Sequence, residues 1–539
     1  MKRTVGRQAM EVVKKTIGHI FLELAGRYKE KEALFYQENR MRYTYGVMAW
    51  EIERVGRALL GLGIKKGDNV ALWAPNLPEW IIAQLSLAAI GSVMVPINPA
   101  SEQEEVHHIL SQTGARAIIM SKGLDGEEYI DIIADEKTRL EALEHVIVFG
   151  DTSFPETILW SELGSRTNTA GTGEFTTALE GVQPEDPAAI MYTSGTTGKP
   201  KGVVLDHLGL VNKSLCAAER LGLGPGDKSC LFFPLYHMFG NTCIALTTLL
   251  KGGSIVIPSS EFDPSSVLQA IASEGCTSVY GSPSMFSALI EDPLFKKKGW
   301  ETVNKGIVGG APCPSQLMDK LVNEVGINGL VVGYGITEAS SWITMTFPDD
   351  PLELRTTTIG TALPCNEIKI TDPDTGDELV AGEKGELCTK GFLMKGYYKM
   401  PAATAASVDR EGWFHTGDLA TRDGNGYVQL KGRLKEVIRK DGEEILPAEI
   451  EELIYGLPQV AEAQVFGFTD KRGKTRIGAC IRLNKDGRLQ ASEVHQVLEA
   501  ELGPGKLPEF IKIVERFPVT RSGKVQKFKL AEMAAREWK

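Results

Sequence analysis

Short β-rich runs alternate with helical patterns along most of the chain, and this alternation constrains the fold more than any other feature of the sequence. Such an order of elements is typical of layered α/β proteins, in which helices cover a mostly parallel sheet. We therefore expect an α/β fold. The expected strands include Ala117–Met120, His145–Phe149, Ala188–Tyr192, Ser254–Ile257, Thr277–Tyr280, Lys305–Val308 and Leu330–Tyr334, and the expected helices include Trp80–Ala89, Ser101–Leu110, Ser265–Ser273 and Pro314–Val325.

The pattern changes in the last third of the chain. Between Glu353 and Gly391, short strands separated by strong turn signals predict a small β subdomain. The residues after Lys435 read as helix, strand, strand, helix and a basic tail. Because 539 residues exceed what one hydrophobic core normally holds, we place a domain boundary here. The prediction is an N-terminal domain of residues 1–434 and a C-terminal domain of residues 435–539.

The overall composition argues against several classes of protein. Apolar residues make up 42% of the chain and charged residues 24%, as in a globular enzyme, and the net charge is −11. A nucleic-acid partner is not expected, because its affinity would rest on a basic surface. The eight cysteines form no CxxC pair and show no metal-ligand spacing, which indicates buried, reduced thiols.

No segment of the sequence is predicted to cross a membrane. The longest apolar run, Trp80 to Ile97, contains Gln84, Gly91 and Pro96, and it reads as a buried helix that leads into a buried strand. The N-terminal residues lack the apolar core of a signal peptide. A cytoplasmic location is therefore expected.

The most informative segment is a run of glycine, hydroxyl and lysine residues that directly follows the expected strand Ala188–Tyr192. Glycines let backbone N–H groups approach an anion, hydroxyl groups add donors, and lysines add positive charge, so the run suits a polyphosphate. A Walker A loop is disfavoured, because only two residues separate Gly195 from Gly198 and Pro200 follows Lys199. An ordinary surface loop is the alternative. The run consists of Thr193, Ser194, Gly195, Thr196, Thr197, Gly198, Lys199, Pro200, Lys201 and Gly202.

The segment Ser194–Gly202 resembles the signature of the adenylate-forming enzymes, which include acyl-CoA synthetases, firefly luciferase and the adenylation domains of peptide synthetases. Further motifs in the family's order extend the resemblance roughly from Tyr43 to Lys529. The resemblance implies a large N-terminal domain of two α/β subdomains and a β-barrel-like subdomain, followed by a small, mobile α+β C-terminal domain. It also implies ATP, Mg²⁺ and the co-substrate coenzyme A.

A carboxylate, Glu338, follows the expected strand Leu330–Tyr334, at the end of the strand where open α/β sheets bind ligands. Mg²⁺ prefers carboxylate oxygen together with substrate phosphates, although a solvated loop residue is the alternative. The resemblance implies that Glu338 and Thr196 hold Mg²⁺ and that Tyr334 packs on the adenine. The full implied nucleotide site is Thr193, Ser194, Gly195, Thr196, Thr197, Gly198, Lys199, Lys201, Gly310, Ala311, Pro312, Gly333, Tyr334, Gly335, Thr337, Glu338, Asp418, Arg433 and Lys524.

An aromatic cluster at Pro234–Gly240 contains His237. A satisfied core histidine is the alternative, but the resemblance implies that His237 gates the acyl site and acts in catalysis with Thr196 and Lys524. No carboxylate is present at Leu235 or Tyr236 to pair with an α-amine, so an α-amino acid substrate is disfavoured. The implied acyl pocket carries little charge and consists of His237, Phe239, Val308, Gly309, Gly333, Ile336 and Trp342.

The C-terminal motifs complete the resemblance. Trp413–Asp418 is similar to the family's ribose-binding motif, in which Asp418 and Arg433 would contact the ribose. The family's adenylation lysine falls on Lys524 in the basic tail, rather than on Lys527 or Lys529, and its hinge falls on Lys435. Coenzyme A is assigned to Lys440 and Gly442. Asp441 stands where relatives commonly have a glycine, so it could bring negative charge to the thiol path.

The resemblance implies an acyl-CoA ligase, which would turn ATP, a carboxylic acid and coenzyme A into acyl-CoA, AMP and diphosphate through an acyl-adenylate. The uncharged pocket favours an apolar medium- or long-chain fatty acid, or a carbocyclic or aromatic acid. The alternatives are an adenylating enzyme that loads a carrier protein in trans, a luciferase-like oxidant of the adenylate, and an inactive nucleotide-binding homologue. The acid, the direction of the reaction and the oligomeric state, including a homodimer, are left open.

Overall fold

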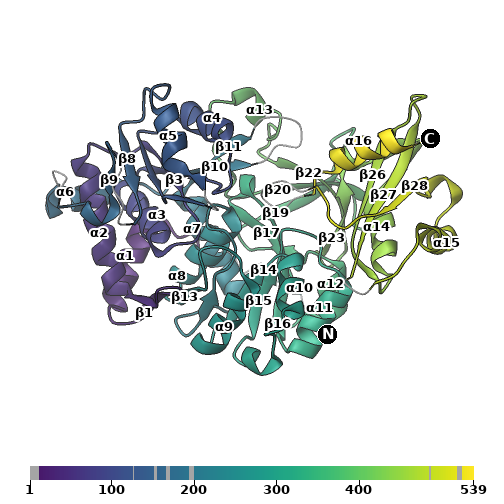
Figure 1. Cartoon of the computed structure of the whole chain (residues 1–539), viewed down its shortest axis with the longest axis horizontal. Coiled ribbons are helices and arrows are strands. Elements are labelled where there is room, and N and C mark those ends of the chain that lie inside the picture. The colour runs from purple at the N-terminus through teal and green to yellow at the C-terminus, as the bar shows by residue number, and fades with distance from the viewer. Residues whose placement is uncertain are drawn as a thin grey trace. The chain divides into compact units, whose positions relative to one another are not determined.

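The computed structural model describes residues 11–124, 127–150, 155–165, 170–193, 200–484, 487–518 and 525–538 (Figure 1). The chain forms two compact units. The first contains Met1–Ile368 and Thr389–Phe414, and the second contains Lys369–Cys388 and His415–Lys539. Both units combine helices with sheets, so the predicted fold class is confirmed. The predicted domain boundary between residues 434 and 435 stays a prediction, because the division into compact units does not identify the point about which a domain rotates.

The first unit contains two large sheets in which most neighbouring strands are parallel. Five consecutive pairings in the first of them, from β10 to β9, are parallel, as the alternation of strands and helices predicts. The first sheet has the order β21 (Gly396–Tyr397), β11 (Lys201–Asp206), β10 (Pro187–Thr193), β4 (Val93–Ile97), β3 (Asn69–Trp73), β5 (Ala117–Met120), β8 (His145–Val148) and β9 (Ile158–Leu159).

The second large sheet has a parallel centre and antiparallel edges. The strands β2 and β17 pair antiparallel with their inner neighbours, and β18 pairs antiparallel with β17. The order is β18 (Thr361–Ala362), β17 (Ser341–Met345), β16 (Gly329–Ile336), β15 (Lys305–Val308), β14 (Ser278–Gly281), β12 (Lys228–Cys230), β13 (Ser254–Ile257), β1 (Glu32–Tyr36) and β2 (Met41–Thr44).

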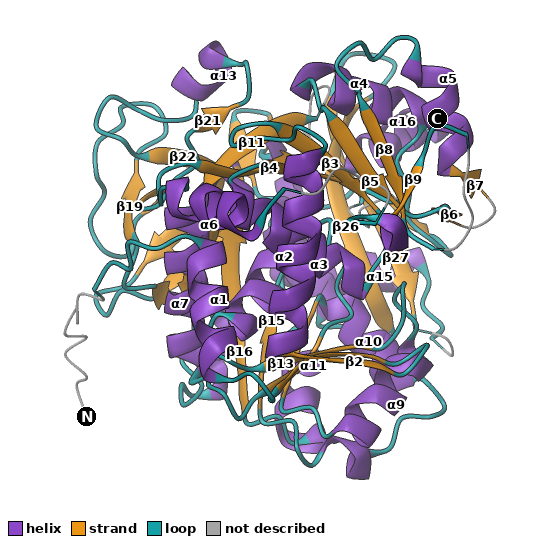
Figure 2. Ribbon diagram, turned by 90° about the vertical axis from the view of Figure 1, so that its left-hand side faces the viewer, coloured by secondary structure: helices purple, strands orange, loops and turns teal. Residues whose placement is uncertain are grey.

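The main core lies between the two sheets, where helices fill the space. Along β3, Val70 and Leu72 join this core, whereas Ala71 and Trp73 point to the other face, as the period of a strand requires. The helices α1, α2 and α3 lie side by side within this layer (Figure 2). The helices of the inner layer are α1 (Ile17–Arg27), α2 (Tyr45–Gly61), α3 (Pro78–Ile90) and α7 (His207–Leu221), while α4 (Gln103–Thr113) and α5 (Tyr129–Lys137) cover the outer face of the first sheet.

Local sequence signals explain where several of these helices begin and end. Asp206 caps the start of α7 by accepting the N–H of Gly209 at 2.8 Å, as a good N-cap residue does. Pro78 opens α3 and Gly91 ends it in a left-handed conformation. All but one residue of α3 is buried, and β4 is buried throughout, so the apolar run Trp80–Ile97 is the buried helix and strand that its composition predicts.

The described residues of the second unit form three small sheets. The predicted β subdomain is the sheet β19 (Glu367–Thr371), β20 (Lys384–Lys390), β22 (Phe414–Arg422) and β23 (Val428–Arg433). After it come a hairpin of β24 (Ile438–Lys440) and β25 (Glu443–Ile445), α14 (Pro447–Tyr455), the paired strands β26 (Val460–Thr469) and β27 (Thr475–Leu483), α15 (Ala491–Glu501), β28 (Phe510–Ile513) and α16 (Lys527–Glu537). The expected order of helix, strand, strand and helix therefore omits the hairpin, β28 and α16.

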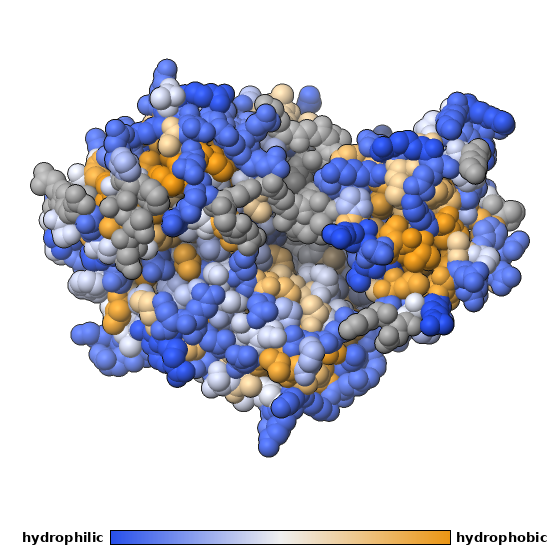
Figure 3. Space-filling view, viewed as in Figure 1, coloured by the Kyte–Doolittle hydropathy of each residue, from blue (hydrophilic) through white to orange (hydrophobic). Residues whose placement is uncertain are grey.

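Among the residues that the structure describes, no helix combines the length and the apolar composition needed to span a bilayer. Hydrophilic side chains cover much of the face seen in Figure 3, and smaller apolar areas lie between them.

Candidate active site

The two ends of the predicted phosphate loop are held together by a hairpin. Thr193 ends β10, Lys201 begins β11, and the antiparallel register of these strands places the two residues opposite each other. The loop itself, Ser194, Gly195, Thr196, Thr197, Gly198 and Lys199, lies outside the described residues. The hairpin therefore fixes where the loop starts and ends, at the last residue of β10 and the first residue of β11.

Lys201, at the end of the phosphate loop, and Glu338, the predicted magnesium ligand, both contact Tyr397. The ammonium of Lys201 is 4.4 Å from the centre of the Tyr397 ring, and the hydroxyl of Tyr397 donates to Glu338 Oε1 at 2.8 Å. Glu338 lies in a single 3₁₀ turn, Thr337–Ala339, directly after β16. The structure thus brings together a cation and a carboxylate that are 137 residues apart in sequence, and both are predicted ATP-site residues.

The predicted adenine-binding segments follow two neighbouring parallel strands. Val308 pairs with Val332 in the register of β15 and β16, so the turn after β15 and the end of β16 lie beside each other. Gly310, Ala311 and Pro312 are exposed there, which leaves room for a flat group. Tyr334 and Gly335 stand at a bulge between β16 and β17. Of the remaining predicted contacts of this segment, Gly333 lies on β16 and Thr337 begins the 3₁₀ turn that follows the strand.

The predicted acyl wall is built around Trp342, whose side chain is buried. A Cβ atom added to Gly333 would come within 2.8 Å of the Trp342 indole, and one added to Gly309 would come within 3.3 Å. The indole therefore packs directly on both glycines. Phe239 meets it edge to face, with ring centres 5.2 Å apart. Val308 is fully buried and Ile336 is partly buried, so the wall is apolar, as predicted.

Two polar side chains also hydrogen-bond the backbone carbonyl group of Trp342. The side-chain amide of Asn366 donates to the carbonyl oxygen of Trp342 at 3.0 Å, and Lys213 donates to the same oxygen at 3.2 Å. Lys213 is fully buried, and burial lowers the pKa of its ammonium to about 8. The backbone of Trp342 is consequently held by the strand β17 and by these two side chains.

His237, the predicted gate of the acyl site, is partly buried at the start of the aromatic cluster. Its Nδ1 accepts the backbone N–H of Phe239 at 3.1 Å, which places the proton of the neutral ring on Nε2. The ring centre lies 5.4 Å from that of Phe233. His237 is therefore held in one orientation next to Phe239, a member of the acyl wall.

In the second unit, the predicted ribose contacts form an ion pair. Asp418 on β22 and Arg433 on β23 are directly opposite each other in the sheet, and Arg433 Nε lies 3.1 Å from Asp418 Oδ1. The carboxylate is almost fully buried, whereas about half of the Arg433 side chain is exposed. Both groups that were predicted to contact ribose are thus adjacent.

The start of β22, which carries Asp418, is held by Glu386. Glu386 Oε1 accepts the N–H of Gly417 and Oε2 contacts His415 Nδ1, both at 2.8 Å. The Cys388 sulfur lies 3.4 Å from the same ring nitrogen, so these three side chains could form a cation site by distance alone. Since the glutamate already accepts two hydrogen bonds from this part of β22, we assign it a role in holding the strand before Asp418.

The residues predicted for coenzyme A and for the hinge lie near the hairpin β24–β25. Lys435 is exposed in a short 3₁₀ turn, Leu434–Glu436. Gly442 occupies the hairpin turn with a φ of 86°. Lys440 is mostly buried, and its ammonium contacts Glu509 at 2.8 Å, so a bound anion would have to compete with that carboxylate.

The predicted adenylation lysine, Lys524, lies outside the described residues. Its neighbour Lys527 contacts both Glu436 and Glu451 at 2.9 Å. Burial lowers the pKa of Lys527, but the two carboxylates outweigh burial and raise it above the ordinary value. Lys527 is therefore engaged in ion pairs, one of which ties α16 to α14, and the choice of Lys524 over Lys527 stays a prediction.

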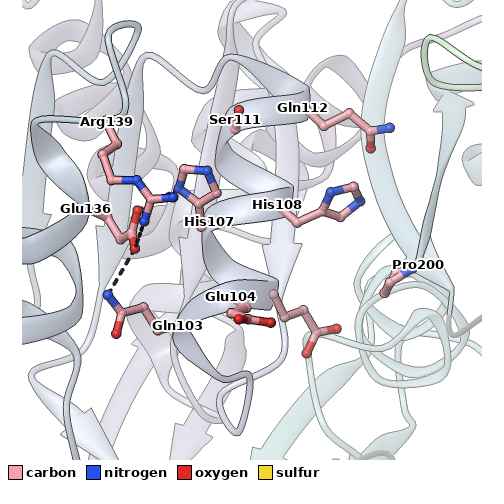
Figure 4. A pocket seen from close by; sticks show the side chains of 10 residues that line it. Gln103, Glu104, His107, His108, Ser111, Gln112, Glu136, Arg139 and Pro200 are labelled. Carbon is pink, nitrogen blue, oxygen red and sulfur yellow. Dashed lines mark hydrogen bonds and ion pairs between the residues drawn. The ribbon is translucent and has the colours of Figure 1, made fainter. Parts of the chain in front are cut away.

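A hollow of about 860 Å³ lies on α4 beside Pro200, the first described residue after Thr193. Figure 4 shows His108 and Gln112 on the side of α4 that faces Pro200. On the other side, Glu136 accepts from Gln103 and Arg139 at 2.9 Å and contacts His107 at 2.6 Å. Because the lining includes Glu104 and Glu105 as well as Glu136, its charge does not suit a polyphosphate.

Sequence reasoning missed Tyr397. This residue belongs to a strand of only two residues, β21, and it reaches Glu338 because β21 pairs with β11 from more than 190 positions away. A Gly-Tyr-Tyr run shows no local sign of such a pairing, so no signal in the sequence alone identifies the contact.

Comparisons with known proteins identify the family of the chain. The family model for the AMP-binding enzymes matches residues 21–398, and the model for the C-terminal domain of AMP-binding enzymes matches residues 449–524. The chain is 35% identical over 537 residues to YngI of Bacillus subtilis (strain 168), assigned as an acyl-CoA synthetase, with 97% of each chain covered. It is 33% identical to the medium-chain acyl-CoA ligase ACSF2 of Danio rerio, with 95% of this chain and 87% of the relative covered.

Among solved structures, the ATP-bound crystal structure of MatB from Rhodopseudomonas palustris superimposes with a TM-score of 0.83 at 26% identity. The superposition covers 97% of this chain and all of MatB. Since one family model covers most of the first unit and a relative above 30% identity matches nearly the full length, the assignment does not rest on the phosphate loop alone. The chain belongs to the adenylate-forming AMP-binding enzyme family, among the acyl-CoA synthetases.

Proposed function

We propose that the chain joins a carboxylic acid to AMP and then passes the acyl group to the thiol of coenzyme A. The observation that carries this proposal is the placement of Lys201 and Glu338 on either side of Tyr397. A cation for phosphate and a carboxylate for Mg²⁺ are thereby brought to one place at the ends of β10, β11 and β16. The likeness to ATP-bound MatB and to named acyl-CoA ligases supports the same activity.

In the first step, an oxygen of the substrate carboxylate attacks the α-phosphorus of ATP. The bond from that phosphorus to the bridging oxygen breaks, and diphosphate leaves with the electron pair. Both reactants are anions, so the barrier is set largely by positioning and electrostatics. We assign Ser194–Lys201 to the departing phosphates, Lys524 to the charge that develops at the α-phosphate, and Asp418 and Arg433 to the ribose.

Glu338 fits a magnesium ion. Its Oε2 atom has no hydrogen-bond partner among the described residues, and its side chain is partly exposed. A carboxylate oxygen next to substrate phosphates is the environment that Mg²⁺ prefers. We propose Thr196 as the second protein ligand. When bound, Mg²⁺ would supply positive charge to the phosphate oxygens of ATP.

In the second step, the sulfur of coenzyme A attacks the carbonyl carbon of the adenylate and a carbon–sulfur bond forms. The bond from that carbon to the phosphate oxygen breaks, AMP leaves with the electron pair, and the thiol proton is released to solvent. We propose that the C-terminal domain turns about Lys435 between the two steps, so that Lys524 gives way to the segment with Lys440 and Gly442. Hinges are short segments that absorb the backbone change, and Lys435 lies in such a segment. A cytoplasmic location and a homodimer stay predictions.

The apolar wall favours an uncharged acyl group. Phe239, Val308 and Trp342 line it without a charged side chain, and Trp342 occupies the space over Gly309 and Gly333. We therefore propose an apolar monocarboxylic acid, either a medium-chain fatty acid or a carbocyclic or aromatic acid. The name of the medium-chain ligase ACSF2 supports the first of these.

A screen of acids tests the proposed reaction. Straight-chain acids of graded length, benzoate, cyclohexanecarboxylate and malonate are incubated with ATP and Mg²⁺, with and without coenzyme A, and AMP is measured. The expected result is acid-dependent AMP release that coenzyme A accelerates, with malonate inactive. Turnover only with an acyl-carrier protein as acceptor would instead favour carrier loading, and the absence of ATP consumption with every acid would contradict the proposal.

The role of Lys524 is tested by separating the two half-reactions. Lys524→Ala should lower acid-dependent exchange of labelled diphosphate into ATP about 10²–10³-fold, by analogy with the loss of one group that stabilises a transition-state charge. Thiolation of a supplied acyl-adenylate should stay close to the wild-type rate. Lys529→Ala is the matched control, since Lys529 is a nearby lysine of α16 that no step uses. Equal losses in both half-reactions would refute the assignment.

A further inference from the structure

Tyr397 links two parts of the proposed ATP site that come from distant segments. Its hydroxyl donates to Glu338 Oε1 at 2.8 Å, and its ring carries the Lys201 ammonium at 4.4 Å from the ring centre. Only 7% of the residue is exposed. One buried side chain therefore touches both the proposed magnesium ligand and the last lysine of the phosphate loop.

The backbone around Tyr397 leaves the ring little freedom. β21 pairs with β11 so that Tyr397 faces Val203 and Gly396 faces Val204. The N–H of Tyr397 is donated to Thr404 Oγ1 at 2.9 Å. Gly396 has a φ of 142°, and a Cβ atom there would approach Thr404 to 3.1 Å, so only glycine fits the turn into the strand.

The same segment also holds the backbone of Glu338. The N–H of Met394 donates to the carbonyl oxygen of Glu338 at 2.8 Å, three residues before the tyrosine that holds the side chain. Because the backbone carbonyl oxygen of Glu338 and its side-chain Oε1 are both held by hydrogen bonds, Oε2 points in one direction. Hydrogen bonds of this kind orient metal-binding carboxylates and are a common part of metal sites.

Burial, and then the neighbouring Glu338 carboxylate, raises the pKa of Tyr397 well above its ordinary value.

We propose that Tyr397 is a positioning residue for ATP, which orients the Glu338 carboxylate toward Mg²⁺ through its hydroxyl and supports Lys201 through its ring. This inference rests on the proposed function. It separates two effects in one side chain, because the hydroxyl acts on the metal ligand and the ring acts on the phosphate lysine. Loss of a partner that orients a metal ligand commonly lowers metal affinity about 10–100-fold.

The test measures binding without turnover. Isothermal titration calorimetry in the absence of any acid gives two dissociation constants, one for ATP with Mg²⁺ and one for ATP with a chelator. The metal advantage is the dissociation constant for metal-free ATP divided by that for ATP with Mg²⁺. Tyr397→Phe should reduce this advantage about 10-fold or more while the affinity for metal-free ATP stays unchanged. Tyr397→Leu should in addition weaken metal-free ATP, because it removes the ring beneath Lys201.

The adjacent tyrosine supplies a matched control. The Tyr398 hydroxyl accepts from Asn69 at 3.2 Å and lies 3.4 Å from the carbonyl oxygen of Thr113, so Tyr398→Phe removes a comparable hydroxyl directly after β21 without touching Glu338. It should leave the metal advantage unchanged. If Tyr397→Phe behaves like Tyr398→Phe, the inference is wrong.

A double-mutant cycle keeps the result independent of any general loss of stability. In a Glu338→Gln background, Tyr397→Phe should change the metal advantage by less than about twofold, because its target is gone. Additive effects would overturn the inference. If the wild-type protein neither binds ATP with Mg²⁺ nor consumes ATP with any acid, the proposed function fails, and that outcome is distinct from a wild type that binds while Tyr397→Phe has no effect.

Discussion

Asp418 and Arg433 face each other across β22 and β23, with Arg433 Nε 3.1 Å from Asp418 Oδ1. The carboxylate is almost fully buried, and the arginine side chain is half exposed. Ribose hydroxyl groups can donate to such a carboxylate, and the proposed ribose contact is the basis of the first prediction.

Asp418→Asn should weaken ATP binding while the fold is retained. The amide has nearly the same shape but cannot accept two charge-assisted hydrogen bonds, so we expect the KM for ATP to rise about 10–100-fold. The KM for the acid should change little. Steady-state kinetics with each substrate varied in turn measure both values.

Glu378→Gln is the control for Asp418→Asn. Glu378 pairs with Arg422 at 3.3 Å in the same unit, and more than half of its side chain is exposed. It should leave the KM for ATP unchanged. An Asp418→Asn enzyme with wild-type affinity for ATP would remove the ribose assignment.

The sequence predicts the fold class and the position of most strands around the site, because these features depend on local patterns. The strand before the phosphate loop, the run Trp80–Ile97 and the strand before Glu338 are all found close to their predicted bounds. Each is apolar over several residues and is bounded by glycine or proline, so burial and turn chemistry agree.

Long-range pairings and short elements could not be predicted. Tyr397 meets Glu338 only because the two-residue strand β21 pairs with β11, and no local pattern encodes that register. The hairpin β24–β25 was missed because its strands have three residues each. Lys440 was assigned to coenzyme A from its place in the sequence, which gives no sign of its ion pair with Glu509.

Trp342→Leu should shift the preferred acid toward longer or bulkier acyl groups. The indole packs on Gly309 and Gly333, so a smaller side chain opens space in the proposed acyl pocket. Each methylene that the enlarged pocket accommodates changes selectivity by about 1–3 kcal/mol. The ratio of kcat/KM for two acids of different length measures the shift.

Phe286→Leu is the control for Trp342→Leu, because Phe286 is a fully buried aromatic residue that lies outside the acyl wall. It should lower the free energy of unfolding and leave the preference for acids unchanged. Equal shifts in both variants would show that Trp342 does not limit the acyl pocket.

His207 should make the protein less stable as the pH falls below neutrality. The ring is fully buried, and burial lowers its pKa to about 4, while the Nδ1 atom accepts the N–H of Ile17 at 3.4 Å. An unfolded histidine takes up its proton near pH 6.5, so the unfolded state binds more protons between these values. The contribution of neutral His207 to the free energy of unfolding is fully present above about pH 6.5. It is lost as the pH falls toward 4, and the loss is at most about 3 kcal/mol.

His207→Gln should flatten this dependence. Urea unfolding of the wild type and the variant at pH 7.5 and pH 5 gives the change in the free energy of unfolding for each. Carboxylates titrate in both proteins, so the difference between the two changes reports His207 alone. Identical changes in the two proteins would contradict the assignment.

Asp441→Gly should improve the use of coenzyme A. Asp441 has a φ of 52° in the β24–β25 turn, which a glycine adopts without strain, and its charge lies beside the proposed path of a polyanionic substrate. We expect a lower KM for coenzyme A and an unchanged KM for ATP. Arg40→Gly, at a φ of 57° in the turn between β1 and β2, controls for relief of backbone strain of roughly 1 kcal/mol. An unchanged KM for coenzyme A would place Asp441 away from the thiol path.

The central claim is that the acid is activated as an acyl-adenylate, and the fate of its oxygen atoms tests this directly. The preferred acid, carrying heavy oxygen in both carboxylate positions, is converted in the presence of ATP, Mg²⁺ and coenzyme A, and the products are weighed by mass spectrometry. The account predicts one heavy oxygen in AMP, one in the thioester and none in diphosphate. Heavy oxygen in orthophosphate or diphosphate, or AMP without it, would contradict the account.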